Sequence, residues 1–329
     1  MPDAAATDSG IAVVIPTIGR ADALELTLNT LALQTRRPAE VFVVHSGSDH
    51  ETRALCERDW RARGLTVRYH AYPFKSAALQ RDFAVRRTAL PLILLSDDDM
   101  EFEPDFVERL FDVLWGDPQI AATMGKISNQ IFGEPTPLWR LYRRLVAGRR
   151  AKSPGAVIGA LVHNGFPTDG HDPARTEWFA GGTTLLRKSA YLSVGGFAPY
   201  FRGSSPGEDI DLGYRLSRRW KVFYVPAARS LHHQSPLGRE DIGRHQYLSM
   251  RSRYAFCRAS AGIGAMRSLG HIALWAFFQT ASEVVQLRHG RLRGDFLAAC
   301  WGRVRGLWSC VGWDPATERY PEWHGTHAA

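Results

Sequence analysis

Three adjacent aspartates, Asp97, Asp98 and Asp99, are the side chains of this sequence best suited to chemistry. Neighbouring carboxylates repel one another, so such a cluster favours a cationic partner. Hard divalent cations such as Mg²⁺ and Mn²⁺ take oxygen ligands, and a diphosphate could complete their coordination. The plain alternative is an acidic turn that caps the following helix. Because the cluster directly follows a wholly apolar run at residues 92–95, we favour a metal–diphosphate site.

A second acidic pair, Glu208 and Asp209, opens a predicted helix over residues 208–218. The pair could simply cap that helix. It could also supply a general base, because a hydroxyl nucleophile needs a positioned carboxylate to take its proton. Adjacent acids also drive their pKa values apart, which leaves one of them more basic.

Two histidines and two arginines could complete such a site. His232 and His233 follow a predicted strand at residues 222–225, where a histidine is either a further ligand of a cation or a core side chain. Arg20 and Arg81 could each make a two-pronged contact with phosphate oxygens. By default, however, a helical arginine is a solvated side chain, so the surrounding elements must decide.

Those elements alternate between strand and helix. Apolar runs typical of buried parallel strands occupy residues 11–15, 41–44 and 92–95, and a further strand is predicted at residues 67–70. Helices are predicted at residues 21–33, 50–63, 76–89 and 104–115. This alternation predicts an α/β fold with a mostly parallel, doubly wound sheet flanked by helices. Ligands bind at the carboxyl ends of the strands in such sheets, where Thr17, Asp49 and Asp97 lie.

The pattern is less regular after Gly116. Residues 138–152 are basic, and residues 153–173 are predicted as a loop. A strand is predicted at residues 183–187, a short helix at 189–194, and a helical, basic C-terminal extension from residue 239.

Composition limits the functional classes. The chain has 329 residues, of which 45% are hydrophobic and 22% charged, as in ordinary globular proteins. A net charge of +8 suits nucleic acid, an anionic membrane surface or phosphorylated small molecules. No basic run with interleaved aromatic residues resembles a nucleic-acid-binding module, so no nucleic-acid partner is predicted.

Cysteine usage and the N-terminal residues predict a cytoplasmic protein. The four cysteines show no paired spacing, and the first ten residues lack a basic segment followed by an apolar one. No uncharged apolar stretch is long enough to cross a bilayer.

Taken in order, several motifs resemble the GT-A fold of inverting family 2 glycosyltransferases. They occupy residues 13–20, 43–49, 79–82, 95–99, 179–188, 195–197, 207–212 and 226–233. Each motif is weak alone, but their order and spacing across residues 11–238 make the resemblance specific. It implies transfer of a sugar from a nucleotide-diphosphate sugar to an acceptor hydroxyl, with inversion.

The resemblance also implies a role for each matching position. The nucleotide sugar would contact Pro16, Thr17, Arg20, Asp49, Arg81, Asp97, Asp98, Trp178, Gly181 and Gly182. Asp99 and His232 would ligate Mn²⁺ or Mg²⁺, with His233 as the alternative ligand. Asp209 would be the catalytic base, with Glu208 as the alternative.

Two positions depart from the family pattern. His45 stands where the family usually has the aspartate that reads the nucleobase, so UDP is only the default nucleotide. Asp82 stands where the family usually has asparagine, which adds a negative charge near the donor side.

Two other functions fit the sequence less well than glycosyl transfer. A nucleotidyltransferase would need a phosphate loop rich in glycine and arginine after the first strand, which residues 16–20 lack. A catalytically inactive module that only binds nucleotide sugars would not need both Asp99 and Asp209.

Three segments are assigned from the sequence: a flexible N-terminus at residues 1–10, the glycosyltransferase domain at 11–238 and the helical extension at 239–329. In the extension, Trp275, Phe277 and Phe278 precede several arginines. One interpretation is an amphipathic helix pair that touches the inner face of a membrane, where a lipid-linked acceptor would wait. The other is a helical surface packed on the core or in a homodimer. A glycan or a small molecule also remains a possible acceptor.

Overall fold

A computed structural model describes residues 10–47, 49–130, 135–166, 170–204, 206–235, 240–287 and 295–321. The expected flexible N-terminus therefore lies outside the described residues except for Gly10, as do Arg288, Arg291 and Arg293 of the extension.

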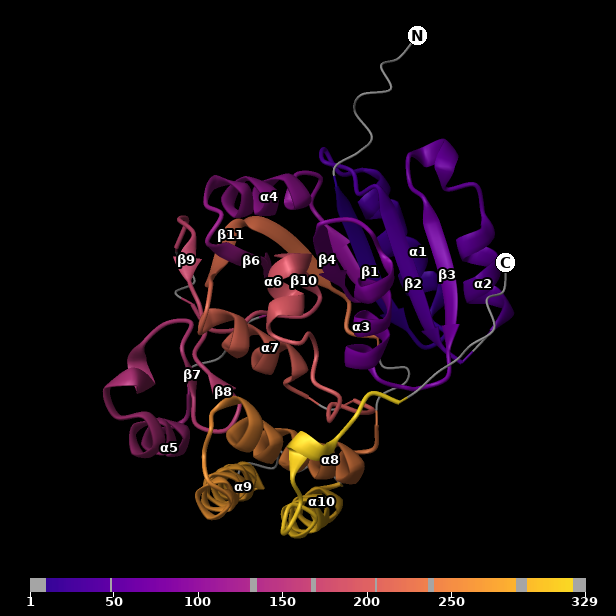
Figure 1. Cartoon of the computed structure of the whole chain (residues 1–329). Helices are drawn as coiled ribbons and strands as arrows, with labels where there is room; N and C mark the ends of the chain where they lie inside the picture. The colour runs from indigo at the N-terminus through magenta and orange to yellow at the C-terminus, as the bar shows by residue number, and fades with distance from the viewer. Residues whose placement is uncertain are drawn as a thin grey trace.

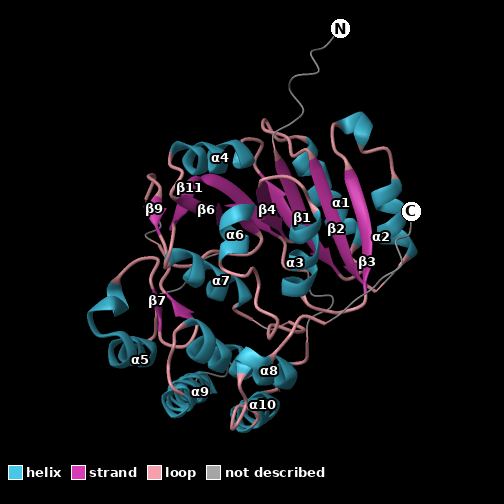
Figure 2. Ribbon diagram, viewed as in Figure 1, coloured by secondary structure: helices cyan, strands magenta, loops and turns pink. Residues whose placement is uncertain are grey.

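A single large sheet forms the centre of the molecule (Figures 1 and 2). Its strands follow the order β3 (Val67–Tyr72), β2 (Glu40–Ser46), β1 (Ile11–Thr17), β4 (Leu92–Ser96), β10 (Thr183–Arg187), β6 (Ile120–Ile127), β11 (Lys221–His232) and β5 (Met100–Phe102), and β9 (Ala174–Arg175) pairs with β11. The first four strands in this order are parallel, and β10 runs antiparallel to both of its neighbours. The expected α/β sheet flanked by helices is confirmed.

The strands read as continuous apolar runs because helices cover both faces of the sheet. Every residue of β1 is buried. Its odd-numbered side chains, such as Val13, pack with helix α1 (Ala21–Ala32) and helix α4 (Phe106–Gly116), and its even-numbered ones, such as Val14, pack with helix α3 (Ala77–Arg87). Because β1 and β4 are parallel neighbours, the loops that follow them emerge at the same edge of the sheet.

Several elements differ from the prediction. The helix expected over residues 50–63 ends as α2 (His50–Glu57), and a 3₁₀ turn, η1, follows at Arg61–Arg63. Trp60 is buried between them and its indole nitrogen donates to Leu55 O at 2.8 Å, so the chain bends inward there. Strand β11 runs well beyond the predicted residues 222–225. A register shift between Val225 and Arg229 lets it pass Pro226, which has no N–H to donate.

Three further elements were not predicted: β5, which follows the aspartate cluster, and β6 and helix α5 (Pro137–Ala147), which lie where the sequence looked irregular. The short helices α6 (Lys188–Ser193) and α7 (Glu208–Ser217) follow the predictions closely. Between α5 and β9 lie the 3₁₀ turn η2 (Gly148–Lys152) and a small hairpin of β7 (Val157–Ile158) and β8 (Val162–His163).

The predicted helical extension is confirmed as α8 (Ile242–Ala255), α9 (Ala265–Leu287) and α10 (Phe296–Trp308), which gather with α5 at one end of the molecule (Figure 1). Glycines let α8 and α10 approach closely, since a Cβ at Gly306 would lie 2.7 Å from Met250 Cβ. None of the described helices combines the length and apolarity needed to cross a bilayer.

Candidate functional site

A pocket of about 260 Å³ opens at the carboxyl ends of β1 and β4, and we call it the strand-end pocket. Six of the side chains predicted from the sequence line it: Pro16, Thr17, Arg20, Asp97, Asp99 and His232. They come from the loops after β1 and β4 and from the end of β11, so the topology of the sheet brings together residues far apart in the chain.

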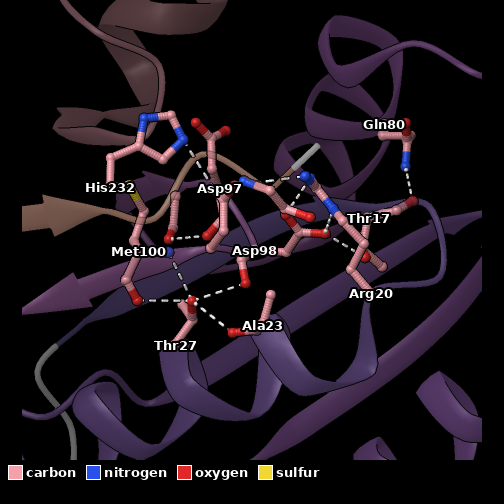
Figure 3. A network of polar contacts seen from close by, with 12 residues as sticks. Thr17, Arg20, Ala23, Thr27, Gln80, Asp97, Asp98, Met100 and His232 are labelled. Atoms are coloured by element: carbon pink, nitrogen blue, oxygen red, sulfur yellow. Dashed lines mark hydrogen bonds and ion pairs between the residues drawn. The ribbon is translucent and has the colours of Figure 1, made fainter. Parts of the chain in front are cut away.

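Asp98 forms the floor beneath this pocket and is fully buried. Thr17 Oγ1 donates to Asp98 Oδ2 at 2.6 Å, Arg20 Nε donates to the same oxygen at 3.0 Å, and Arg20 Nη2 pairs with Oδ1 (Figure 3). Burial raises the pKa of Asp98 to about 6 despite the opposing charge of Arg20. Asp98 thus holds Arg20 in position, and it does not line the pocket where the nucleotide was expected to contact it.

Asp97, Asp99 and His232 form a group that could hold a cation. One ligand atom from each lies within 4.8 Å of the others. Asp99 Oδ1 lies 3.0 Å from His232 Nε2, and Asp99 Oδ2 accepts from the backbone N–H of Ser235 at 2.9 Å. Burial alone would raise the pKa of Asp99, but His232, the Ser235 amide and the charge of Arg20 together outweigh burial and lower it.

The loop that carries these aspartates is pinned to α1. Thr27 Oγ1 accepts from Met100 N at 3.0 Å and lies 3.0 Å from the carbonyl oxygen of Asp98 (Figure 3). The structure does not bring His233 to the group. Its Nε2 lies 2.9 Å from Glu101 Oε2 on the exposed surface, so only His232 of the two predicted histidines points inward. Asp97, expected to contact the nucleoside, joins the group instead.

Arg81 connects the aspartate group to the second acidic pair. Although it lies on a helix, its side chain is buried. Its Nη2 pairs with Asp97 Oδ1, and its Nη1 lies 3.3 Å from Glu208 Oε1. One guanidinium thus links the strand-end pocket with the first turn of α7, which is the juxtaposition that the sequence could only suggest.

Asp209 is held by backbone amides. Its Oδ2 accepts from Gly181 N at 3.0 Å, and its Oδ1 accepts from Ile210 N at 2.8 Å. Burial raises the pKa of both Asp209 and Glu208, and the negative charge of Asp209 raises that of Glu208 further. The backbone amides favour the ionised form of Asp209, so Asp209 carries the charge and Glu208 tends to keep its proton.

The predicted glycines and Trp178 form the wall beside these acids. A Cβ at Gly182 would lie 2.6 Å from Asp97 Oδ2, and one at Gly181 would lie 3.0 Å from Arg81 Nη1, so a side chain at either position would press on these two groups. Trp178 is buried, and its indole nitrogen donates to Asn164 O at 3.0 Å. It therefore supports the wall from behind and does not line the strand-end pocket.

Asp49 and the departures from the family pattern lie at the margin. Asp49 caps α2 by accepting from Thr52 N at 2.6 Å, and its Oδ2 lies 3.0 Å from His45 Nε2. Burial lowers the pKa of His45 against the charge of Asp49. Asp82 accepts from Tyr191 Oη and Arg86 Nε, both at 2.6 Å, so its carboxylate has structural partners.

Lys75 and Gln80 also line this pocket, and neither was predicted as a site residue from the sequence. Gln80 is buried, and its amide nitrogen donates to Thr17 O at 3.0 Å and to Val44 O at 2.6 Å, which ties the ends of β1 and β2 together. Lys75 is exposed just before α3. The only signal for either was its nearness to Arg81 in the chain.

Comparison with known proteins identifies the family. A model described as glycosyl transferase family 2 matches residues 12–202, which is more than half of the chain. The chain belongs to glycosyl transferase family 2. The sequence is 28% identical over 269 residues to N-acetylglucosaminyl-diphospho-decaprenol L-rhamnosyltransferase of Mycobacterium tuberculosis, covering 74% of this chain and 82% of that protein. It is 29% identical over 230 residues to validoxylamine A glucosyltransferase of Streptomyces hygroscopicus subsp. limoneus, covering 66% of this chain and 49% of that protein.

Solved structures agree on the fold. GalNAc-T7 with UDP, GalNAc and Mn²⁺ superposes with a TM-score of 0.57 at 16% identity, covering 75% of this chain and 47% of that one. The mannosyltransferase PcManGT of Pyrobaculum calidifontis with GDP-Man and Mn²⁺ superposes with a TM-score of 0.54 at 15% identity, covering 92% of this chain and 86% of that one. The GT-A fold expected for this family 2 glycosyltransferase is confirmed, and glycosyl transfer is favoured over nucleotidyl transfer.

Proposed function

We propose that this glycosyltransferase moves a sugar, with inversion, from a nucleoside-diphosphate sugar to a hydroxyl of a lipid-linked acceptor, in a reaction that depends on Mn²⁺ or Mg²⁺. The observation that carries the proposal is the pairing of Arg81 with Asp97 on one side and Glu208 on the other. It joins a set of cation ligands to a set of candidate bases within one site.

The donor set fits a hard divalent cation. Ligands about 2.1 Å from one octahedral cation, at right angles to each other, lie about 3 Å apart. Asp99 Oδ1 and His232 Nε2 have that spacing, at 3.0 Å, and an oxygen of Asp97 lies within reach of both. Two carboxylates and an imidazole suit Mn²⁺ or Mg²⁺ when a diphosphate supplies the remaining oxygens. The bound cation would stabilise the charge on the leaving diphosphate.

The chain's own residues supply the remaining steps. Arg20, which Asp98 orients, and Lys75 give the strand-end pocket two cations that can face phosphate oxygens. Asp209 accepts the proton of the attacking hydroxyl, because its carboxylate is ionised and aimed by two backbone amides. Glu208 is the alternative base. Attack from the face opposite the diphosphate inverts the anomeric carbon.

Donor identity can be tested by binding and turnover together. The full chain is incubated with UDP-, GDP- and dTDP-sugars, with Mn²⁺, Mg²⁺ or EDTA, and its melting temperature and donor hydrolysis are measured. UDP is the default, and the matching donor should raise the melting temperature only when metal is present. Stabilisation without any turnover would identify an inactive binding module, and stabilisation that persists in EDTA would overturn the metal site.

The choice of a lipid-linked acceptor rests on exposed apolar surface at the helical end of the molecule. On α10, Leu297, Trp301, Val304 and Trp308 follow one another at helical spacing and are 57–79% exposed. Exposed apolar side chains also occur on α5 and α9, namely Leu141, Leu145, Met266 and Phe277. Arginines flank them, as at Arg144 and Arg305. Apolar side chains beside basic ones suit the surface of an anionic bilayer.

We therefore place the enzyme at the cytoplasmic face of a membrane, bound peripherally. The relative from Mycobacterium tuberculosis is named for an acceptor on a lipid diphosphate, which agrees with this proposal. Co-sedimentation with anionic vesicles at low salt tests it. Trp301→Ser with Trp308→Ser should release the protein from vesicles. If the wild type does not bind vesicles but dimerises through this face, the surface is a homodimer interface instead.

A further inference from the structure

A second, larger pocket of about 870 Å³ lies between α5, η2, the β7–β8 hairpin, α8 and α9, and we call it the helical pocket. It shares no lining residue with the strand-end pocket. Neither the family match nor the sequence motifs assign it a role, since most of its lining comes from the irregular middle of the chain and from the C-terminal extension.

The charges that line the helical pocket are all positive within the described part of the chain. Arg143, Lys152 and Arg253 contribute cations, and no described carboxylate lines it. Arg253 Nη1 donates to the carbonyl oxygen of Ala160, and its guanidinium lies 3.7 Å from the centroid of the Trp275 ring. No described carboxylate forms an ion pair with Arg253, and burial lowers its pKa to about 10. A cation held against desolvation without an acid favours an anionic ligand.

The rest of the lining is aromatic. Trp139 on α5, Trp275 on α9 and Phe166 after β8 face the same space. The lining residues Trp139 and Arg143 are one helical turn apart, and the exposed Leu141 and Leu145 lie on the same helix. A ligand with an anionic group and an apolar chain could therefore place the anion at the arginines and lead the chain out along α5 towards the apolar surface.

One wall separates the helical pocket from the candidate base. The side chain of Leu161, which lines the pocket, packs against Gly207, where a Cβ would lie 2.8 Å from Leu161 Cδ1. The His163 ring lies 4.0 Å from the Trp178 ring, centroid to centroid. Trp178 begins the segment whose Gly181 amide donates to Asp209. A sugar at Asp209 would have its neighbouring group beside this wall.

We propose that the helical pocket binds the diphosphate of a prenyl-diphosphate-linked acceptor, with the prenyl chain leaving along α5 and α9. This assignment rests on the proposed function, because it presumes that the hydroxyl presented to Asp209 belongs to a lipid-linked sugar. Two interactions would hold the acceptor. Arg143, Lys152 and Arg253 would bind the anionic diphosphate, and the aromatic side chains would contact the apolar chain.

Binding of farnesyl diphosphate to the full chain tests this directly, without turnover. Titration is followed by calorimetry in EDTA, so that no cation recruits the diphosphate to the strand-end pocket. Farnesol supplies the chain alone and inorganic pyrophosphate supplies the anion alone. We expect farnesyl diphosphate to bind at least about tenfold more tightly than either. Equal binding of farnesol would overturn the anionic site, and equal binding of pyrophosphate would overturn the lipid-linked ligand.

Matched variants locate the binding. Arg143→Ala and Lys152→Ala should each weaken farnesyl diphosphate about tenfold. Their controls, Arg144→Ala and Arg149→Ala, remove exposed arginines that do not line the pocket and should change binding less than twofold. Lys152 is itself exposed, so its variant should fold even if Arg143→Ala does not. Equal weakening by the controls would reduce the effect to general charge attraction and overturn the site.

The outcome is separable from that of the proposed function. Farnesyl diphosphate should bind equally well to Asp99→Ala, which lacks an aspartate of the strand-end pocket. Where the enzyme turns over, Lys152→Ala should raise the KM for a prenyl-diphosphate acceptor and leave the KM for the donor unchanged. A rise in the donor KM alone would move the lysine to the donor side and overturn the proposal.

Discussion

The strand-end pocket and the helical pocket differ in charge and in how that charge is balanced. Around the strand-end pocket and the first turn of α7, Arg20 pairs with Asp98 and Asp99, Arg81 pairs with Asp97 and Glu208, and backbone amides hold Asp209. In the helical pocket, Arg143, Lys152 and Arg253 line the space, and no described carboxylate does. The first region has an excess of negative charge and the second has an excess of positive charge.

On the proposed function, this difference would separate donor from acceptor by chemistry. A nucleotide diphosphate is repelled by a cluster of carboxylates unless a divalent cation comes with it, so the strand-end pocket would select a metal-bound anion. The helical pocket would bind a diphosphate without metal, because its arginines and lysine already supply the charge. The acids at the start of α7 lie between the two, where the acceptor hydroxyl and the donor sugar would meet.

The largest effect should come from the cation ligands. Asp99→Ala and His232→Ala remove two of the three grouped ligands, so metal-dependent turnover should fall by at least about 10³-fold. Donor hydrolysis and transfer with Mn²⁺ would measure it. Glu101→Ala and His233→Ala are matched controls, because that pair faces solvent beside the group. If His233→Ala loses as much activity as His232→Ala, the metal group has been assigned to the wrong histidine.

Asp209, the proposed base, lies between the two pockets, and its removal should have the next largest effect. Asp209→Asn should lower kcat at least about 10²-fold with little change in either KM, whereas Glu208→Gln should cost less. The carboxylate must be ionised to accept a proton, and burial raises its pKa. Activity should therefore be lost as the pH falls through a value above the ordinary range of aspartate.

A pH–rate profile of the wild type and both variants would check this. An acidic limb at the ordinary aspartate pKa would contradict the buried base. A Glu208→Gln variant as inactive as Asp209→Asn would leave the two carboxylates acting as one unit.

The strand-end pocket could largely be predicted from the sequence, because its residues directly follow regular elements. Asp97 to Asp99 directly follow a five-residue buried strand, β4, and Thr17 is the last residue of β1, with Arg20 just beyond it. The partners within the cluster could not be predicted. Asp97 and Asp98 are neighbours of the same type, yet their partners differ. Asp98 binds Thr17 and Arg20 beneath the pocket, whereas Asp97 faces His232 and Arg81. Only packing decides which carboxylate faces the pocket.

The helical pocket could not be predicted at all. Its lining residues lie in α5, in short turns and in the C-terminal helices, and they meet only through long-range packing. The stretch at residues 138–152 was predicted only to be basic, yet most of it folds into α5, with Pro137 in the first turn and Tyr142 fully buried. The middle strand β6 was missed because it is rich in small residues. One of them, Gly125, lies where a Cβ would be only 2.3 Å from Phe106 Cε2.

A smaller effect should come from His163, a histidine in the lining of the helical pocket. Burial, together with the charges of Arg143 and Arg253, lowers the pKa of His163 to about 4. The unfolded chain therefore binds a proton that the folded chain refuses between about pH 6.5 and 4, and stability falls as the pH falls. Between pH 7.5 and 5 this single histidine should cost about 2 kcal/mol of unfolding free energy.

Denaturant unfolding at both pH values would measure the cost. His163→Gln should flatten the pH dependence by that amount, whereas His171→Gln, at an exposed histidine, should leave it unchanged. An unaltered slope in His163→Gln would mean that His163 is not kept neutral by its surroundings in the helical pocket.

The smallest effect should come from Asp82, the position where the family usually has asparagine. Asp82 lies next to Arg81 in the chain, yet its carboxylate accepts from Tyr191 and Arg86, away from the strand-end pocket. Asp82→Asn keeps an oxygen for the Tyr191 hydroxyl and loses only the partly exposed pair with Arg86, so unfolding free energy should change by about 1 kcal/mol or less. The donor KM should stay within twofold, because this charge takes no part in the negative cluster around Asp97 and Asp99.

Thermal melts and donor titrations of the variant would measure both, with Asp82→Ala as the comparison that also removes the hydrogen bond to Tyr191. A tenfold change in donor KM for Asp82→Asn would show that the charge of Asp82 does act on the donor in the strand-end pocket.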